Sequence, residues 1–125
     1  MKRSEVEKNS KVRDLLDDIT EKLRTIYGGS LHSVIVYGSY ARGGQSDESD
    51  IDIMVLLNAD EDTIKLKNIF LMETVATLSL EHGIIVSIIE QSYEKYMQYI
   101  EYVPFYSNVN REGMNIYERK NQRAL

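Results

Sequence analysis

The apolar residues of this chain recur in two periods, one typical of helices and one typical of buried strands. Apolar side chains return about every 3.6 residues across residues 4–27, before Gly28 and Gly29, and this spacing predicts an amphipathic helix that covers one face of a sheet. Three shorter runs are almost continuously apolar, which predicts strands. These runs cover residues 33–37, 51–57 and 84–90.

A second helical pattern covers residues 60–82 and is followed by Gly83, a residue type common at helix ends. The apolar residues at helical spacing within it are Ile64, Leu66, Ile69, Phe70, Met72, Val75, Ala76 and Leu80. Further along, Ser92 is a suitable N-cap for a helix from residue 93 to 101 or 102, and Pro104 ends that pattern. The remaining expected elements are a short helix over residues 105–111 and an edge strand over residues 114–117.

Helices that alternate with three or four short strands predict an α/β fold. The expected architecture is a small mixed β-sheet flanked by helices. With 125 residues, the chain is expected to form a single domain over residues 1–125, too short for a catalytic domain plus a full substrate-binding domain.

Composition narrows the classes of partner. The formal net charge is −5 and the isoelectric point is near 5.0, so the chain lacks the basic surface typical of nucleic-acid binders, and a protein or small-molecule acceptor is favoured. The absence of cysteine excludes disulfides and thiolate metal sites. No apolar run approaches the roughly 20 residues of a membrane span. We therefore expect a cytoplasmic protein without a membrane partner.

Two aspartates open the second expected strand. Side chains at alternate positions of a strand share a face, so Asp50 and Asp52 point the same way while Ile51 and Ile53 point into the core. Carboxylates about 6–7 Å apart repel each other unless a cation or protons intervene. Mg²⁺ accepts one or two carboxylates and takes its other ligands from water and phosphate oxygens. The pair therefore predicts a magnesium site that docks a nucleoside triphosphate.

Gly38 and Ser39 come directly after the first expected strand and supply a candidate nucleotide-binding turn. A glycine there permits an unusual backbone turn and lets a phosphate approach the main chain closely. Ser39 adds an N–H and a hydroxyl at the start of a short helix expected over residues 39–43, whose N-terminus favours anions. Arg42 is a candidate for a further phosphate contact, and a surface ion pair is the equal alternative.

Together these motifs resemble the DNA polymerase β-like nucleotidyltransferase superfamily, and within it the minimal nucleotidyltransferase (MNT) branch. The family pattern is Gly-Ser, then ten residues, then Asp-x-Asp. The matching residues are Gly38, Ser39, Asp50 and Asp52, with Ala41, Arg42, Gly43 and Ser49 also at positions usual in that branch. The resemblance implies a palm-like core, a site for Mg²⁺ with ATP or another triphosphate, and transfer of a nucleoside monophosphate to an acceptor.

The resemblance also implies a third acidic residue on a later strand, which completes the metal site and helps to deprotonate the acceptor hydroxyl. In the strand expected over residues 84–90, Ser87 stands in the middle and Glu90 at the end, and the strand period places the two on opposite faces. Glu90 is the candidate third catalytic acid. One alternative is Asp47 or Glu48 in the loop before Asp50. The other is an acceptor that ionises without a strong base.

Five of the nine tyrosines fall within residues 93–106. Tyr96, Ile100 and Val103 share a helical face and are expected to pack onto the sheet. Because a helix has about 3.6 residues per turn, tyrosines three residues apart do not stay on one face. The other tyrosines are therefore expected at the surface. Simple packing and a partner-binding patch are equal alternatives for them.

These features together lead us to expect a magnesium-dependent nucleotidyltransferase that transfers AMP from ATP to a protein hydroxyl. For short members of the MNT branch, the resemblance implies a tyrosine of a HEPN-domain ribonuclease toxin as the acceptor, and hence an antitoxin. Two alternatives stay open: a nucleotide-binding module that neutralises its partner by contact, and an enzyme that modifies a small molecule. The nucleotide base, the number of metals and homo-oligomer formation stay open as well.

Overall fold

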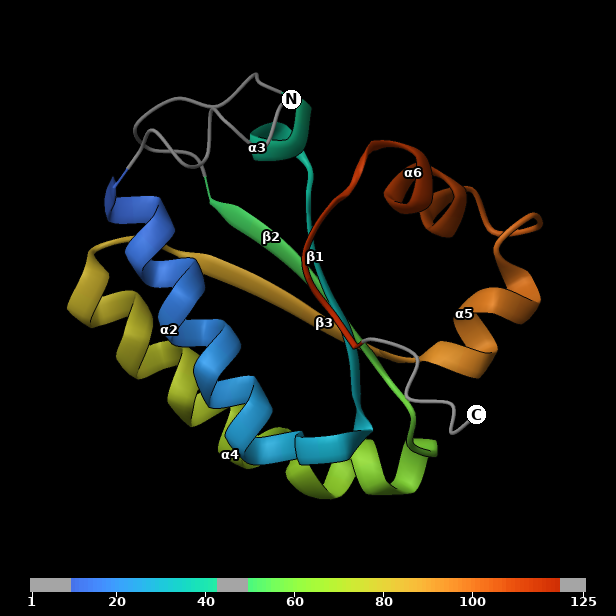
Figure 1. The fold of residues 1–125 in the computed structure, drawn as a ribbon, viewed down its shortest axis with the longest axis horizontal. Helices are drawn as coiled ribbons and strands as arrows, with labels where there is room; N and C mark the ends of the chain where they lie inside the picture. Colours follow the sequence, from blue (N-terminus) through green and yellow to red (C-terminus); the bar gives the residue numbers. More distant parts are fainter. Residues whose placement is uncertain (1–9, 43–49, 120–125) are drawn as a thin grey trace, which may run out of the picture.

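The computed structural model describes residues 10–42 and 50–119, and only the backbone of Ser39 and Arg42 within them. One β-sheet lies between two layers of helices (Figure 1). The helices α2 and α4 cover one face, and α5 and α6 cover the other. Their bounds are Ser10–Tyr27 for α2, Glu61–His82 for α4, Tyr93–Tyr99 for α5 and Pro104–Glu112 for α6.

The sheet has four strands in the order β3-β2-β1-β4. The strands are β1 (Leu31–Tyr37), β2 (Ile51–Leu57), β3 (Val86–Ser92) and β4 (Met114–Glu118). β1 runs antiparallel to both β2 and β4, whereas β2 and β3 are parallel. The predicted class, a small mixed sheet flanked by helices, is therefore confirmed, and β4 is an edge strand as expected.

The central strand β2 is buried on both of its faces. Ile53 and Val55 pack into the core formed with α2 and α4, and Met54 and Leu56 pack into the second core beneath α5 and α6. All four side chains are 2% exposed or less. Burial on both faces explains why every residue of this strand after Asp52 is apolar, with no alternation with polar residues.

The helix α4 matches the predicted bounds, but most of the apolar residues that predicted it do not face the core. Its buried side chains are Leu71, Val75 and Leu78. Four others are exposed to 66% or more, namely Leu66, Ile69, Phe70 and Leu80. The helix is apolar on two faces, and the spacing alone does not say which face packs inward.

Within residues 10–42 and 50–119, no helix is long and apolar enough to cross a membrane.

The third strand begins two residues later than predicted and leads directly into α5. Ser92 ends β3 and also caps α5, since its hydroxyl accepts a hydrogen bond from the Lys95 N–H at 3.3 Å. The sequence predicts this cap, but it predicts the preceding strand over residues 84–90, because Ile84 and Ile85 extend the apolar run. In the structure these two residues connect α4 to β3.

The tyrosines of the α5–α6 segment divide between packing and exposure. Tyr96 is 2% exposed in the second core, Tyr93 stacks on His32, and the Tyr106 hydroxyl donates to Gln91 at 2.8 Å. Tyr102 is 77% exposed. The expectation that Tyr96 packs onto the sheet is confirmed, and so is the exposure of part of the set.

Replacing Tyr96 with phenylalanine is expected to raise the free energy of unfolding by about 1 kcal/mol, because the Tyr96 hydroxyl is buried without a hydrogen-bond partner among the described residues. Tyr106→Phe is the matched control and should lower it by about 0.5–1.5 kcal/mol, since that hydroxyl loses its bond to Gln91. Urea denaturation measures both values. A clear loss of stability in Tyr96→Phe would mean that the hydroxyl is paired.

Candidate functional site

A glycine turn and an aspartate lie against each other where β1 ends. Tyr37, the last residue of β1, is opposite Asp52 in the β1–β2 pairing. Gly38 follows with a φ of +75°, and a Cβ added there would overlap the carboxylate oxygen Oδ2 of Asp52. Only glycine combines this left-handed turn with so close an approach to a carboxylate. The turn therefore presents bare backbone beside an acid.

The short helix predicted after this turn is present as α3 (Ser39–Arg42). Tyr40 and Ala41 are 5% and 2% exposed, so the core holds the helix in place. The backbone of the predicted phosphate-binding residues Ser39 and Arg42 belongs to α3, but their side chains lie outside what the structure describes. The loop alternatives Asp47 and Glu48 also lie outside the described residues.

The two predicted metal ligands stand at the entrance to β2. Asp50 is exposed immediately before the strand, and Asp52 is half-buried within it. Ile51 and Ile53 are fully buried in the core on the α2–α4 side, as the predicted alternation requires. Asp52 therefore faces the other side of the sheet, on which the second core lies.

Tyr37 is a neighbour of this site that the sequence reasoning missed. Burial, and then the charge of Asp52, raise the pKa of its hydroxyl. Its ring meets the ring of Phe105 edge-on with 5.4 Å between centroids. Its position directly before Gly38 was visible in the sequence, but its pairing with Asp52 depends on the strand register. The site thus combines two carboxylates, a turn at Gly38 without a side chain and the aromatic ring of Tyr37.

Glu90, the predicted third acid, is not brought to these aspartates. It is opposite Val55 on the face covered by α2 and α4, as the strand period predicted. Its carboxylate accepts hydrogen bonds from the Tyr27 hydroxyl and, at 2.6 Å, from the Asn68 amide. Burial first, and then this bond and the charge of Glu90, raise the pKa of Tyr27. Glu90 therefore links α2, α4 and β3.

Ser87 is the β3 residue that stands beside Asp52 in the parallel β2–β3 pairing, and it is exposed. A side chain at this position shares the face of Asp52 on the neighbouring strand. No group of three carboxylate, histidine or cysteine side chains suited to a metal occurs within the described ranges 10–42 and 50–119. Within them, the site offers two carboxylates and a serine where a third acid was expected.

The donor set fits a magnesium ion that is shared with a nucleotide. Carboxylate oxygens are hard ligands of the kind Mg²⁺ prefers, and this ion commonly binds one or two carboxylates plus phosphate oxygens and water. Asp50 and Asp52 supply the carboxylates. The Gly38 backbone lies against Asp52, so a phosphate held at the turn would also reach an ion held by that carboxylate.

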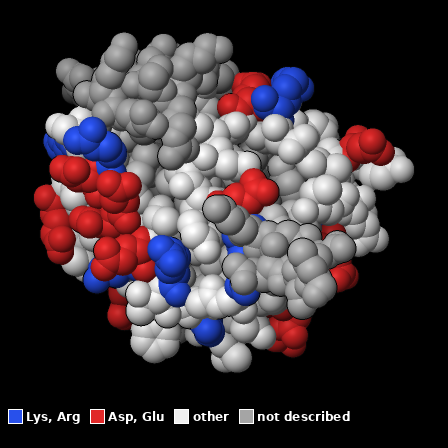
Figure 2. Space-filling view, in the orientation of Figure 1, with Lys and Arg blue, Asp and Glu red and all other residues white. Residues whose placement is uncertain are grey.

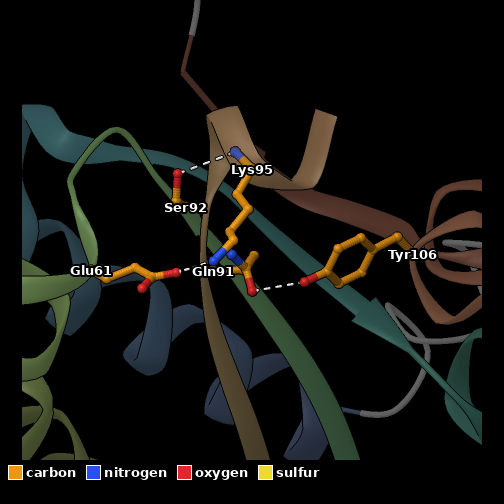
Figure 3. Close-up of polar contacts among 5 residues, drawn as sticks. All are labelled: Glu61, Gln91, Ser92, Lys95 and Tyr106. Atoms are coloured by element: carbon orange, nitrogen blue, oxygen red, sulfur yellow. Dashed lines mark hydrogen bonds and ion pairs between the residues drawn. The ribbon is translucent and has the colours of Figure 1, made fainter. Parts of the chain in front are cut away.

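A second polar cluster lies at the opposite end of β3 (Figure 3). Lys95 on α5 forms an ion pair with Glu61 at the start of α4, and Tyr106 on α6 donates to Gln91. A cavity of about 580 Å³ beside the ion pair is lined by residues that include Asn58, Glu61 and Lys95. These contacts join the starts of α4 and α5 and attach α6 to the sheet, and none of them involves the aspartates.

Comparison with known proteins gives a family match over most of the chain. A family model described as "Nucleotidyltransferase domain" matches residues 16–111. A protein of Methanocaldococcus jannaschii named "Putative protein adenylyltransferase MJ0604" is 30% identical over 102 residues, which are 82% of this chain and 94% of that relative.

Two solved structures are also similar in outline. A "putative nucleotidyltransferase from Sulfolobus solfataricus" is 21% identical with a TM-score of 0.48, and the match covers 95% of this chain and 91% of that one. A structure described as "the toxin-antitoxin with AMP-PNP" is 20% identical with a TM-score of 0.48, and the match covers 83% and 74% of the two chains.

Gly38→Ala is expected to weaken ATP binding at least tenfold and to destabilise the fold by more than about 2 kcal/mol, since it combines a left-handed φ with the overlap on Asp52. Gly28→Ala is the matched control, because Gly28 has a φ of +54° and no atom near its would-be Cβ. It should cost only about 1 kcal/mol and leave ATP affinity unchanged. Calorimetry measures the ATP affinity of each variant, and urea denaturation measures its stability. Equal ATP affinities of the Gly38→Ala and Gly28→Ala variants would argue against phosphate binding at the Gly38 turn.

Glu90→Leu is expected to lower the free energy of unfolding by about 1–3 kcal/mol, because it leaves the Tyr27 hydroxyl and the Asn68 amide without their acceptor. ATP affinity should stay within twofold of the unmodified chain, since Glu90 is on the other face of the sheet from Asp52. Unchanged stability together with lost activity would instead identify Glu90 as a catalytic acid.

Proposed function

This chain belongs to the nucleotidyltransferase domain family, and on that premise we propose that it binds magnesium-ATP at the Gly38 turn and transfers AMP to a protein hydroxyl. The observation that carries the proposal is the contact between the bare Gly38 turn and the carboxylate of Asp52. It joins an anion-accepting backbone to a cation-accepting side chain.

Each residue has a proposed role in holding the nucleotide. Asp50 and Asp52 would bind Mg²⁺ and through it the phosphates. Gly38 and Ser39 would hold the triphosphate through backbone N–H groups, with Arg42 as a further cationic contact. The bound ion would neutralise charge on the phosphates and on the leaving pyrophosphate.

The transfer itself is a displacement at the α-phosphorus. The acceptor oxygen forms a bond to that phosphorus, the bond from the phosphorus to the bridging oxygen of the β-phosphate breaks, and pyrophosphate leaves with that oxygen. The hydroxyl proton passes to solvent water. A tyrosine acceptor suits a site without a third carboxylate, because a tyrosine hydroxyl, with a pKa near 10, ionises more easily than an alcohol. Most of the catalysis would then be positioning and electrostatic stabilisation.

The proposed acceptor is a tyrosine of a HEPN-domain toxin, which would make this chain an antitoxin. A protein acceptor is supported by the name of the Methanocaldococcus jannaschii relative, a protein adenylyltransferase, and by the acidic charge of the chain. The HEPN-domain partner comes from the motif resemblance to the MNT branch. Acceptor and partner are therefore proposed together and tested together.

A second candidate function is favoured by Ser87. Because a serine stands beside Asp52 where the family pattern has an acid, the chain would serve as a nucleotide-binding module that neutralises its partner by contact. This candidate predicts ATP binding without transfer, and a complex that survives the loss of Asp50 and Asp52.

The deciding experiment incubates the chain with Mg²⁺, α-phosphate-labelled ATP and a purified HEPN-domain protein encoded beside it. Label should pass to a tyrosine of that protein, and Asp52→Asn should reduce the transfer rate at least 100-fold, because the carboxylate that anchors the ion is lost. Asp17→Asn is the matched control, an exposed aspartate of α2 that should leave the rate unchanged. Gel autoradiography and mass spectrometry read the result.

The outcomes separate the two candidates. Equal labelling by the unmodified chain and by Asp52→Asn would contradict the enzymatic proposal. A stable complex with bound ATP but no label in either sample would favour neutralisation by contact.

A further inference from the structure

The outer side of α4 carries an apolar stripe that nothing within the described residues covers. Leu66 is 77% exposed, Ile69 68%, Phe70 66% and Leu80 85%. These side chains recur at helical spacing over four turns, with the exposed Ala76 among them. They lie opposite Leu71, Val75 and Leu78, through which the helix packs on its own core. We name these five exposed residues the outer stripe.

The outer stripe is a large apolar patch for a small domain. Taking about 180 Å² for each fully exposed large side chain, its four large members present roughly 500 Å², near the upper end of the patches that ordinary monomers expose. A standard interface buries about 800 Å² on each partner. The stripe together with its polar border is therefore of the size that a docked protein helix covers.

An acidic groove borders the outer stripe on the side of α2. It has a volume of about 390 Å³ and is lined by Asp18, Glu21, Lys22 and Glu81 with Thr74, Thr77 and Leu78. Asp18 is also held by His82 at 2.7 Å, which fixes one carboxylate at the groove wall. Figure 2 shows acidic side chains gathered over α2 on this part of the surface. Three carboxylates against one lysine give the groove a negative charge.

We propose that the outer stripe and the acidic groove together dock an amphipathic helix of a partner protein, with its apolar face on the stripe and arginine or lysine side chains in the groove. The charge of the groove selects this chemistry, because basic side chains along one flank of such a helix would meet three carboxylates. An apolar helix face laid into an apolar surface is a common mode of recognition.

A second copy of this chain is a poorer occupant of the same surface. Glu73 lies in the middle of the stripe, between Phe70 and Ala76, and is exposed. A two-fold pairing that aligns two whole stripes brings Glu73 of one copy against Glu73 of the other, and like charges in contact oppose association. A partner helix that carries no glutamate at that place meets no such repulsion.

The docking surface lies apart from the candidate catalytic site. α4 packs on the face of the sheet that carries Ile53 and Val55, whereas Asp52 faces the other side. A helix bound on α4 therefore leaves the Gly38 turn open to ATP. As the place where the acceptor protein docks, the surface rests on the proposed function, but its recognition chemistry is testable without nucleotide or transfer.

The test uses two labelled helical peptides with identical leucine faces, one with arginines and one with glutamates along the same flank. Fluorescence anisotropy with the full chain should give at least tenfold tighter binding of the arginine peptide. Phe70→Glu and the double variant Glu21→Lys with Glu81→Lys should each weaken that binding at least tenfold. All three positions are exposed on helices, so the variants should fold, which circular dichroism checks.

Matched controls connect the result to this surface. Tyr102→Glu changes an aromatic residue at the α5–α6 turn that is 77% exposed, more than Phe70, and should leave binding unchanged. Asp52→Asn should bind the peptide as the unmodified chain does, so failure of AMP transfer leaves the docking result intact. Equal affinity for both peptides, or loss of binding in Tyr102→Glu alone, would overturn the proposal. A dimer in sedimentation that Phe70→Glu converts to monomer would assign the stripe to a second copy instead.

Discussion

The pairing of β1 with β2 is the interaction on which the candidate site depends. Because the strands are antiparallel and Tyr37 is opposite Asp52, the chain leaves β1 at the end of the sheet where β2 begins. Gly38 can then turn directly against the Asp52 carboxylate, where any larger residue would collide. The buried Tyr40 on one side and the buried Ile53 on the other fix both halves of this contact. A turn suited to phosphate and a carboxylate suited to magnesium are thus held together by the core before any ligand arrives.

Much of the fold was predictable because strong local patterns agree with the tertiary structure. The strand over residues 51–57 has the predicted bounds, since it is apolar on both faces and two aspartates precede its body. The helix α4 was equally clear, because apolar residues recur at helical spacing over residues 60–82 and Gly83 follows, which in the structure ends the helix in the left-handed region. The motif places Gly38 just after the first strand and Asp52 at the start of the second, and the antiparallel pairing of these strands brings the two residues together.

The features that the sequence did not predict depend on strand register and on which face of a helix packs inward. Local sequence patterns do not contain that information. The start of β3 was missed because Ile84 and Ile85 look like strand but form its approach. The exposed face of α4 was missed because Phe70 and Val75 are equally apolar in sequence, although only Val75 is buried. Ser87 beside Asp52 and Glu90 beneath α2 follow from the parallel β2–β3 register, which the order of the strands along the chain does not specify. These two positions explain why β3 brings no third carboxylate to Asp50 and Asp52 within the described residues.

Titration calorimetry of ATP into the folded chain, with Mg²⁺ and then with the ion chelated by EDTA, tests the central claim most directly. If the Gly38 turn and the carboxylates of Asp50 and Asp52 hold the nucleotide through a shared ion, ATP binds with Mg²⁺ present, and its affinity falls at least tenfold without the ion and in Asp52→Asn. ATP affinity that is absent in all three titrations, or that is the same in all three, would contradict the account.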